Sequence, residues 1–544
     1  MNLNKEGDAP VASPSLIIKE LIMNKMWQSD QGDNTYINPV LYADYSDPDV
    51  IRVGDTYYMT ASSFNCVPGL PILISKDLIN WELVNYAVKE IPYEVYNKPA
   101  HAKGIWAPSI RYHDNKFWIY FGMPDEGIFM TQTEDPLGEW SPLVCVKEVK
   151  GWIDPCPLWD EDGNAYLIHA FAKSRVGFNG VLDIVKMSYD GTKILDEGVR
   201  VIEADPNHRT IEGPKFYKRD GYYYIFAPAG GVPQGWQLVM RSKNVYGPYE
   251  MKIVLHQGDS DINGPHQGGL VDDLKGDEWF MHFQDADVYG RIVHLQPVRW
   301  EDGWPMMGID TNDDGIGEPV RSYQKPYCVE QVDFSEPPTA DEFESESLGL
   351  QWQWYANVKS HFYSLSDRKG WLRLNCLNSI GENSPKLWNI PNLLIQKLPC
   401  PSLSIETLGD FSQLKEGDKA GLLVIGKEYA YLGVTKEAEG IVIRYTKSVE
   451  ESGEKKETVL EEIVVKSDQL SLYLNMTPIG VCKFGFAVEG KEAYYFDEAF
   501  IAEDSTWMGA KVGLFGIHEN KEEQGGYVDF NYFRMAANAS SNNA

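Results

Sequence analysis

DPDVIRVGDTYYMTAS, residues 47–62, is the first of five related phrases that decide the fold. Each phrase opens on a small or acidic residue, runs through an apolar strand, turns at a pair such as Asp-Thr or Asp-Gly, and returns through an aromatic or apolar strand. Alternation that stops at such a pair is typical of a β-hairpin. The other four phrases are APSIRYHDNKFWIYFG from Ala107, DPCPLWDEDGNAYLIHA from Asp154, EGPKFYKRDGYYYIFAP from Glu212 and GGLVDDLKGDEWFMHFQ from Gly268.

The spacing of the five phrases predicts a propeller. Their starts, at positions 47, 107, 154, 212 and 268, lie 47 to 60 residues apart. This distance is too long for one hairpin and suits a four-stranded propeller blade, and five blades would close a ring. A composition with 12% aromatic residues, 48 Gly and 31 Pro also fits a mostly β protein. We therefore expect an all-β fold that begins with a five-bladed β-propeller.

Three of the phrases begin with a carboxylate, at Asp47, Asp154 and Glu212. Equivalent positions in a propeller lie at equivalent radius and height, so these side chains are expected to meet at one mouth of the central channel. The alternative is that each carboxylate only caps a turn, because Asp before Pro is a common turn opener. The agreement of all three in register favours a shared functional site at this mouth.

A second domain follows the fifth phrase. The stretch EPVRSYQKPYCVEQVDFSEPPTADEFESESLGLQWQW is rich in proline and acid, and the strands and turn signals after it predict a β-sandwich of about two hundred residues. The sandwich could act as a carbohydrate-binding module, a structural buttress or a lid, and the sequence favours the buttress. We expect an N-terminal extension over 1–35, the propeller over 36–325, a linker over 326–340, the sandwich over 341–536 and a tail over 537–544.

Charge and composition bear on the partners and the location of the protein. A formal charge of -31 argues against nucleic acid or an anionic membrane as partner, because both need basic patches. The seven cysteines are scattered and lack CxxC spacing, which indicates reduced thiols. Residues 1–30 form neither a convincing signal peptide nor a membrane span. These features predict a cytoplasmic protein, and they leave open the oligomeric state and whether a leader was removed.

Six short motifs follow one another along the chain. They are Ser46-Asp47-Pro48-Asp49-Val50, Trp106-Ala107-Pro108-Ser109, Ile153-Asp154-Pro155, Ile211-Glu212-Gly213-Pro214, Gly264-Pro265-His266-Gln267-Gly268-Gly269 and Gly290-Arg291. In the order and the residues of these motifs, the chain resembles glycoside hydrolase family 43. The resemblance is to the branch of β-xylosidases and α-L-arabinofuranosidases whose propeller is followed by a concanavalin-like β-sandwich. The resemblance covers roughly residues 36–535.

The resemblance implies an inverting glycoside hydrolase. Asp47 matches the family's general base, Glu212 its general acid, and Asp154 the residue that holds the acid and keeps its pKa high through like-charge proximity. An oxocarbenium-like transition state needs a proton on the departing oxygen and an ionised partner on the opposite face. About 6.5 to 9.5 Å between the two carboxyl groups leaves room for the attacking water.

The family pattern also implies how the sugar is bound. Trp106 and Phe64 would offer apolar faces to a pentose ring. The alternative is core packing for Trp106 and, for Phe64, a loop aromatic that plugs the rim of the propeller. Arg291 resembles an arginine that reaches sugar hydroxyls and the catalytic acids, and its alternative is a structural salt bridge. His266 either touches the substrate or helps to hold a hydrated ion, often calcium, on the channel axis, although a single histidine is a weak metal site. The resemblance implies no required cofactor.

The expected function is exo-acting release of terminal α-L-arabinofuranose or β-D-xylose from hemicellulose-derived oligosaccharides such as arabinoxylan fragments. The choice between the two pentoses stays open. One alternative is another exo-glycosidase or furanosidase on the same scaffold, such as a retaining fructosidase with its carboxyl groups about 5 to 5.5 Å apart. A second alternative is a sugar-binding propeller without catalysis. A sandwich loop near Phe515 to Gly526 is expected to border the pocket.

Overall fold

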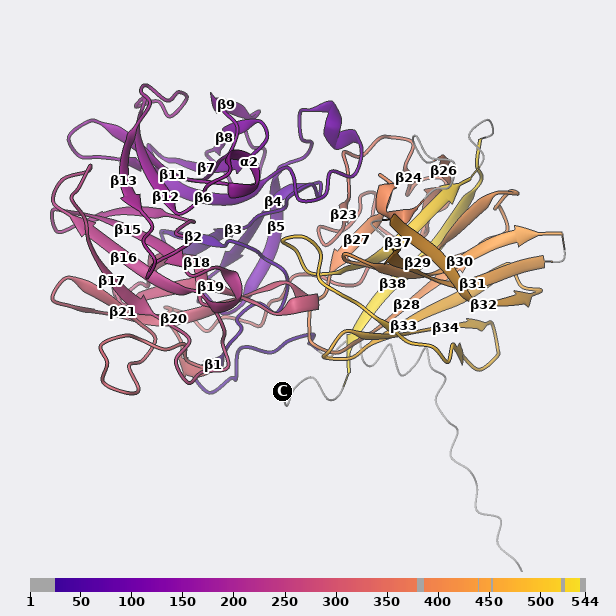
Figure 1. Ribbon diagram of the computed structural model, residues 1–544. Helices are drawn as coiled ribbons and strands as arrows, with labels where there is room; N and C mark the ends of the chain where they lie inside the picture. Colours follow the sequence, from indigo (N-terminus) through magenta and orange to yellow (C-terminus); the bar gives the residue numbers. More distant parts are fainter. Residues whose placement is uncertain (1–24, 379–385, 439, 452–453, 520–523, 539–544) are drawn as a thin grey trace, which may run out of the picture.

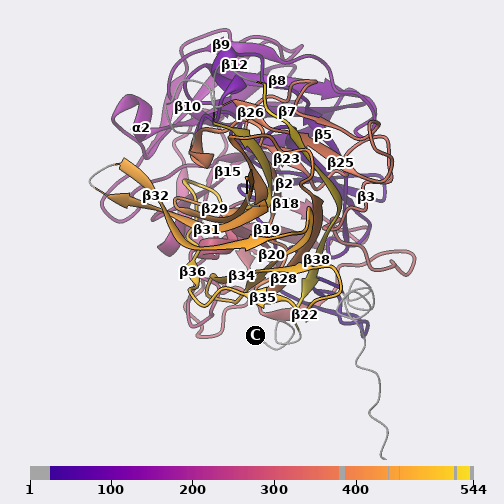
Figure 2. The same ribbon diagram turned by 90° about the vertical axis from the view of Figure 1, so that its right-hand side faces the viewer.

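The computed structural model describes residues 25–378, 386–438, 440–451, 454–519 and 524–538. These residues form two β domains, a propeller in the first part of the chain and a sandwich in the second (Figure 1). Figure 2 looks onto the sandwich, with the propeller behind it. The predicted all-β class, a five-bladed propeller followed by a β-sandwich, is confirmed.

Among the described residues, the propeller comprises five antiparallel sheets of four consecutive strands each. Every phrase found in the sequence supplies the first two strands of one blade. At two of the turns between them both central residues have positive φ, 49° and 59° at Asp114 and Asn115, and 49° and 75° at Asp220 and Gly221. This is type I′ geometry, whose twist matches that of the flanking strands.

The blades lie in sequence order. Blade 1 is β2 (Asp49–Val53), β3 (Thr56–Thr60), β4 (Gly69–Ser75) and β5 (Trp81–Val88). Blade 2 is β6 (Trp106–His113), β7 (Lys116–Met123), β8 (Gly127–Thr133) and β9 (Val144–Glu148), and blade 3 is β10 (Trp152–Trp159), β11 (Ala165–Phe171), β12 (Val181–Met187) and β13 (Val199–Glu203). Blade 4 is β14 (Lys215–Arg219), β15 (Tyr222–Ala229), β16 (Trp236–Ser242) and β17 (Glu250–Leu255), and blade 5 is β18 (His266–Asp272), β19 (Glu278–Asp285), β20 (Arg291–Glu301) and β21 (Trp304–Met307).

Short elements join and flank the blades. The strand β1 (Thr35–Ile37) pairs with β22 (Ser322–Gln324), so the chain segments before and after the propeller lie side by side. The described helices are single turns: η1 (Glu94–Asn97), α2 (Lys173–Val176), η2 (Val232–Gln234), η3 (Asp287–Tyr289) and η4 (Leu387–Asn389). None of the helices in the described ranges is long and apolar enough to cross a membrane.

The sandwich consists of two sheets, each of eight strands within the described chain. The first runs β23 (Gln353–Trp354), β27 (Leu394–Lys397), β37 (Lys511–His518), β29 (Asp418–Ile425), β30 (Tyr429–Glu437), β31 (Gly440–Glu451) and β32 (Glu454–Val465), with β26 (Leu377–Asn378) beside β37. The second runs β24 (Tyr363–Ser364), β25 (Leu372–Asn375), β38 (Tyr527–Ala537), β28 (Leu403–Asp410), β33 (Gln469–Met476), β34 (Val481–Val488) and β35 (Tyr494–Tyr495), with β36 (Phe500–Ile501) beside β34.

The sandwich packs directly against the propeller. Val288 and Tyr289, in η3 of blade 5, belong to the buried apolar cluster that forms the sandwich core. Val67 of the propeller and Trp354 of the sandwich exchange two backbone hydrogen bonds, of 2.9 and 2.7 Å. Shared core residues and shared backbone pairing make the sandwich a buttress of the propeller.

One buried carboxylate joins the two domains. Asp44 is 3% exposed, and its oxygens accept hydrogen bonds from the backbone N–H groups of Arg291 and Gly509, both at 3.1 Å, and from the ammonium of Lys511. Burial alone would raise the pKa of Asp44, but the ammonium groups of Lys511 and Lys397 hold it below its usual value. Asp44 therefore fixes a propeller strand and a sandwich segment to the same point.

Two glycines touch across this contact. A Cβ atom at Gly509 would lie 2.5 Å from the backbone nitrogen of Gly290, and one at Gly290 would lie 2.6 Å from the carboxylate of Asp44. Gly290 also has a φ of 75°, which side chains rarely adopt. The close approach of the two domains thus depends on the absence of a side chain at both positions.

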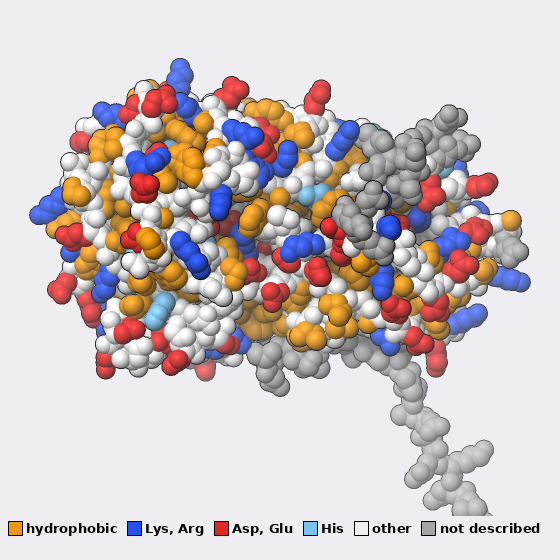
Figure 3. Space-filling model, in the orientation of Figure 1, with side chains coloured by type: hydrophobic (Ala, Val, Ile, Leu, Met, Phe, Trp, Pro, Cys, Tyr) orange, Lys and Arg blue, Asp and Glu red, His pale blue; other side chains and the backbone are white. Residues whose placement is uncertain are grey.

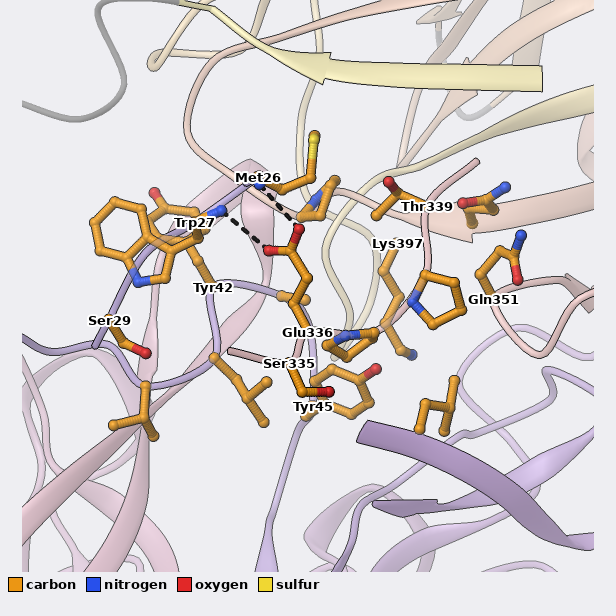
Figure 4. A pocket seen from close by; sticks show the side chains of 18 of the residues that line it. Met26, Trp27, Ser29, Tyr42, Tyr45, Ser335, Glu336, Thr339, Gln351 and Lys397 are labelled. Carbon is orange, nitrogen blue, oxygen red and sulfur yellow. Dashed lines mark hydrogen bonds between the residues drawn. The ribbon is translucent and has the colours of Figure 1, made fainter. Parts of the chain in front are cut away.

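The junction also encloses a cavity of about 60 Å³. Figure 4 shows Glu336 inside it, where the carboxylate accepts hydrogen bonds from the N–H groups of Met26 and Trp27 at 3.1 and 3.4 Å. Burial raises the pKa of Glu336, whereas burial and the nearby Lys511 lower the pKa of Lys397 to about 8. A space of this size has room for a few water molecules.

The surface is mixed in charge. On the face shown in Figure 3, acidic and basic side chains are interspersed over both domains.

All seven cysteines are unpaired, and five of them are buried; Cys145 is exposed and Cys328 is half-buried.

The Asp44 contact predicts a stability effect. Asp44→Asn is expected to lower the free energy of unfolding by about 3–5 kcal/mol, because it leaves the Lys511 ammonium buried without its counter-charge. Urea denaturation of the full chain, followed by tryptophan fluorescence, measures this loss. The control is Asp55→Asn, since Asp55 pairs with Lys76 on the exposed surface, where ion pairs contribute little. Equal losses in the two variants would contradict the prediction.

Candidate active site

A pocket of about 520 Å³ opens at the end of the propeller where the inner strands of the blades begin. Six of the seven site residues expected from the sequence line it: Asp47, Phe64, Trp106, Asp154, Glu212 and Arg291. Other lining residues come from the strands and loops of the blades and from the sandwich, among them Phe171, Asn179, Thr210, Val232, Pro233, Gln267 and Trp507. The structure thus brings the three carboxylates into one cavity, together with aromatic walls.

Irregular backbone aims the site residues into the pocket. Asp47 and Asp154 both have a φ of 55°, and Gln267 has a φ of 40°. The pairing of β10 with β11 shifts register between Ile153 and Cys156, as expected of a β-bulge, and blades 2 and 5 shift at the same place in their inner strands. Bulges re-aim side chains, and strained φ values persist where the surroundings enforce them, both often at functional sites.

Hydroxyl and guanidinium donors surround Asp47. Its Oδ2 atom accepts hydrogen bonds from Ser46 Oγ at 2.7 Å and Ser62 Oγ at 2.6 Å. Arg291 donates to Asp47 Oδ1 at 3.2 Å and also to Ser46 Oγ at 2.7 Å. The Asp47 side chain is therefore held in place by three hydrogen-bond donors.

Asp154 is as buried as Asp47 and has fewer hydrogen-bond donors around it. It is 6% exposed, and its Oδ2 atom accepts a hydrogen bond from the N–H of Gly213 at 2.8 Å. Burial and the charge of Asp47 raise the pKa of Asp154 to about 7. The bond to Gly213 attaches Asp154 to the residue that follows Glu212.

Glu212 is the carboxyl group most strongly disposed to keep its proton. Burial raises its pKa to about 8, helped by the charges of Asp154 and Asp47. Its side chain is 24% exposed and reaches the pocket. The pocket therefore holds a carboxylate surrounded by donors, Asp47, and a carboxyl group that is mostly protonated at neutral pH, Glu212. This pair can supply a base and an acid in the same reaction.

His266 lies behind Glu212 and does not line the pocket. Its ring is 1% exposed, and its Nε2 atom lies 3.2 Å from Glu212 Oε1. Burial and the charge of Arg291 lower the pKa of His266 to about 3, so the imidazole is neutral. It brings no positive charge to Glu212. The structure thus places His266 against the acid, and a contact between His266 and substrate stays a prediction.

The expected calcium site is not supported by the residues around His266. Calcium prefers six to eight oxygen ligands, whereas His266 offers ring nitrogens. Within the described ranges, no group of three or more His, Cys, Asp or Glu side chains could hold a metal ion. The described residues therefore form no calcium cage of protein ligands, and a hydrated ion near His266 stays a prediction.

Four aromatic side chains line the pocket: Phe64, Trp106, Phe171 and Trp507. The Trp106 ring meets Phe64 edge-on at 6.2 Å and Trp507 at 6.1 Å between centroids. Phe64 is only 3% exposed, so it supports Trp106 more than it offers its own face. The Nε1 atom of Trp106 and the Nε2 atom of Gln267 are buried and have no hydrogen-bond partner. Both are donors that a sugar hydroxyl could satisfy.

Trp507 was not expected from the sequence. It is 44% exposed and lies in the loop before β37, two residues ahead of Gly509. A loop near Phe515 to Gly526 was expected to border the pocket, and the described part of that loop does not line it. Phe515 is buried in β37, and Gly526 packs on Gln413 and Asp418 of the sandwich; positions 520–523 lie outside the described residues. A lone tryptophan in a loop carries no periodic signal that would have revealed its role.

Comparison with known proteins gives a consistent result. Residues 36–305 match the family described as glycosyl hydrolases family 43, and residues 340–536 match the β-xylosidase C-terminal concanavalin A-like domain. A putative β-xylosidase of Xylanibacter ruminicola is 40% identical over 500 residues, which cover 90% of this chain and 87% of that protein. A non-reducing end α-L-arabinofuranosidase of Bacteroides ovatus is 30% identical over 431 residues, covering 74% of this chain and 76% of that protein.

A solved structure agrees along nearly the whole chain. A family 43 protein of Bacillus licheniformis, solved as a variant, superposes with a TM-score of 0.80 at 26% identity, covering 93% of this chain and 100% of that one. Sequence and structure therefore match the same family in both domains. The chain belongs to family 43 of the glycosyl hydrolases and is a glycoside hydrolase.

Proposed function

We propose that this hydrolase is exo-acting and inverting, and that it removes terminal β-D-xylose or α-L-arabinofuranose from hemicellulose-derived oligosaccharides. Asp47 serves as the general base, Glu212 as the general acid, and Asp154 as the group that holds and tunes the acid. One observation carries the assignment. A single pocket contains Asp47, which three donors hold, and Glu212, whose pKa is raised to about 8.

The proposed reaction is one displacement at the anomeric carbon. Asp47 takes a proton from a water molecule, and the water oxygen forms a bond to the anomeric carbon. The bond to the leaving oxygen breaks with its electron pair, and Glu212 gives its proton to that oxygen. Arg291 contacts Asp47 and keeps that carboxylate oriented toward the water.

The form of the pocket supports exo action on a small sugar. The Trp507 ring of the sandwich and the Trp106 ring of the propeller meet edge-on at the pocket, which suits a terminal sugar held between the two domains. The two relatives described above are named for the release of xylose and of non-reducing end arabinofuranose. Both names fit a pentose whose ring lies against an aromatic face.

Proton NMR tests the proposed reaction directly. The full chain is incubated with a mixed digest of arabinoxylan oligosaccharides, and the anomeric signals are followed before mutarotation. We expect free xylose or arabinose of inverted configuration, because Asp47 activates water and forms no bond to the sugar. Retained configuration would require a nucleophile and would contradict the mechanism, and the absence of any released sugar would contradict the substrate.

Glu212→Gln is expected to lower kcat on xylo-oligosaccharides by about 10²–10⁴-fold, because the leaving oxygen no longer receives a proton. An aryl glycoside with a good leaving group should recover most of this loss, since it departs without protonation. Steady-state kinetics on both substrates measure the difference. Near-normal hydrolysis of the oligosaccharide by this variant would contradict the role of the acid.

Asp47→Asn is the matched control, because it also replaces a pocket carboxylate by its amide. This variant should be inactive on both substrates, since water needs its base whatever the leaving group. Substantial hydrolysis of the aryl glycoside by Asp47→Asn would assign the base elsewhere.

Trp507→Ala is expected to raise KM about tenfold with a small change in kcat, because the sugar loses one wall of the pocket and the chemistry is untouched. Steady-state kinetics on a xylo-oligosaccharide measure both constants. Trp371→Ala is the control, as Trp371 packs under Arg368 in the sandwich and does not line the pocket. Equal KM values for the two variants would contradict a contribution of the sandwich to substrate binding.

A further inference from the structure

A second set of polar side chains lies in the channel, further along the inner strands that begin at the pocket. Asp49 lies two positions after the pocket residue Asp47, at the start of β2, and Cys156 lies two positions after Asp154 in β10. We call this set the inner layer, and it consists of Asp49, Ser109, Arg111, Cys156 and Lys215.

Lys215 is the most deeply buried cation of the inner layer. It is 1% exposed, and its ammonium donates hydrogen bonds to the carbonyl of Pro108 at 2.7 Å and to Ser109 Oγ at 2.9 Å. Its nitrogen also lies 3.7 Å from Asp49 Oδ2. Burying a charge is costly unless it is paired and hydrogen-bonded, and these three contacts meet that requirement.

Asp49 organises the rest of the inner layer. Its Oδ2 atom accepts hydrogen bonds from the N–H of Ile110 at 2.9 Å and from the Arg111 guanidinium at 2.6 Å. The same guanidinium donates to Cys156 Sγ at 2.8 Å. Two cations, Lys215 and Arg111, therefore share one anion, Asp49, and the inner layer carries one excess positive charge beside the pocket.

The backbone connects Lys215 to the acid pair. The N–H of Gly213 donates to Asp154 at 2.8 Å, Glu212 precedes this glycine, and Lys215 follows it by two residues. The N–H of Phe216 then donates to Cys156 Sγ at 3.2 Å, which closes a second link between β14 and β10. One short segment thus fixes the acid, the partner of the acid and the buried ammonium relative to one another.

We propose that Lys215, held by Asp49, is a positioning residue whose charge decides at which pH the pocket carboxyl groups hold the protons that catalysis needs. This inference rests on the roles proposed above for Asp154 and Glu212. The charge of Lys215 opposes the burial and the Asp47 charge that raise the pKa of Asp154, as do the Gly213 N–H and Arg291. The other charged groups around this assembly are Asp49, Arg111 and Glu212.

The sign of the effect follows from charge alone. The pH profile of kcat/KM has an acidic limb, where activity rises with pH, and a basic limb, where activity falls. Removing the positive charge of Lys215 makes it harder for each neighbouring carboxyl group to lose its proton, so both limbs move to higher pH. Removing the negative charge of Asp49 acts in the opposite direction, so both limbs move to lower pH. A purely structural role would lower kcat/KM without moving the limbs in opposite directions.

The experiment compares pH profiles of kcat/KM on a xylo-oligosaccharide for the full-length wild type, Lys215→Met and Asp49→Asn. We expect the limbs to shift by about one pH unit, upward for Lys215→Met and downward for Asp49→Asn. Lys215→Arg keeps the charge and should restore limbs close to those of the wild type. The matched control is Lys76→Met, at an exposed lysine paired with Asp55, which should leave the profile unchanged.

The outcomes separate this inference from the proposed function. An active wild type whose limbs stay in place in both charge-removing variants overturns the role of Lys215 alone. A wild type that hydrolyses no pentoside, or whose profile lacks two limbs, overturns the proposed function itself. Lys215→Gln, which still offers a donor to Pro108 and Ser109, replaces the methionine variant if the latter does not fold, and its limbs must also move upward.

Discussion

The active site depends on the carboxylate of Asp44, which lies in neither the pocket nor a strand. It holds the backbone of Arg291 on one side and that of Gly509 on the other, and its charge is balanced by Lys511. Arg291 reaches Asp47, and the loop that ends at Gly509 carries Trp507. One buried anion therefore sets the distance between the catalytic propeller and the wall that the sandwich adds to it.

Different electrostatic surroundings give two carboxyl groups of the pocket different roles. Asp47 and Glu212 are both carboxyl groups at the start of a blade, yet one is surrounded by donors and the other by burial and like charge. The neutral His266 beside Glu212 leaves that contrast intact. Along the channel, behind the acid pair, Lys215 and Asp49 of the inner layer add a buried positive charge and a buried negative charge.

The sequence predicted those features that repeat. The repeated phrases with turn pairs such as Asp220-Gly221 predicted the five blades, and the carboxylates at matching positions of the repeats predicted the pocket. Features that depend on contacts between distant segments were missed. Trp507 enters the pocket only because the domains dock, and the burial of His266 depends on how blade 5 packs behind Glu212. Neither contact leaves a periodic trace in the chain.

The contact between the two glycines at the domain junction limits which substitutions these positions accept. Gly290 and Gly509 come from different domains and leave no room for a side chain between them. A side chain at Gly290 or Gly509 would push the domains apart and move Trp507 out of the pocket, although neither glycine lines that pocket. A sandwich taken from another protein would therefore dock on this propeller only if it also placed a glycine opposite Gly290, and it would bring its own residue to the position of Trp507.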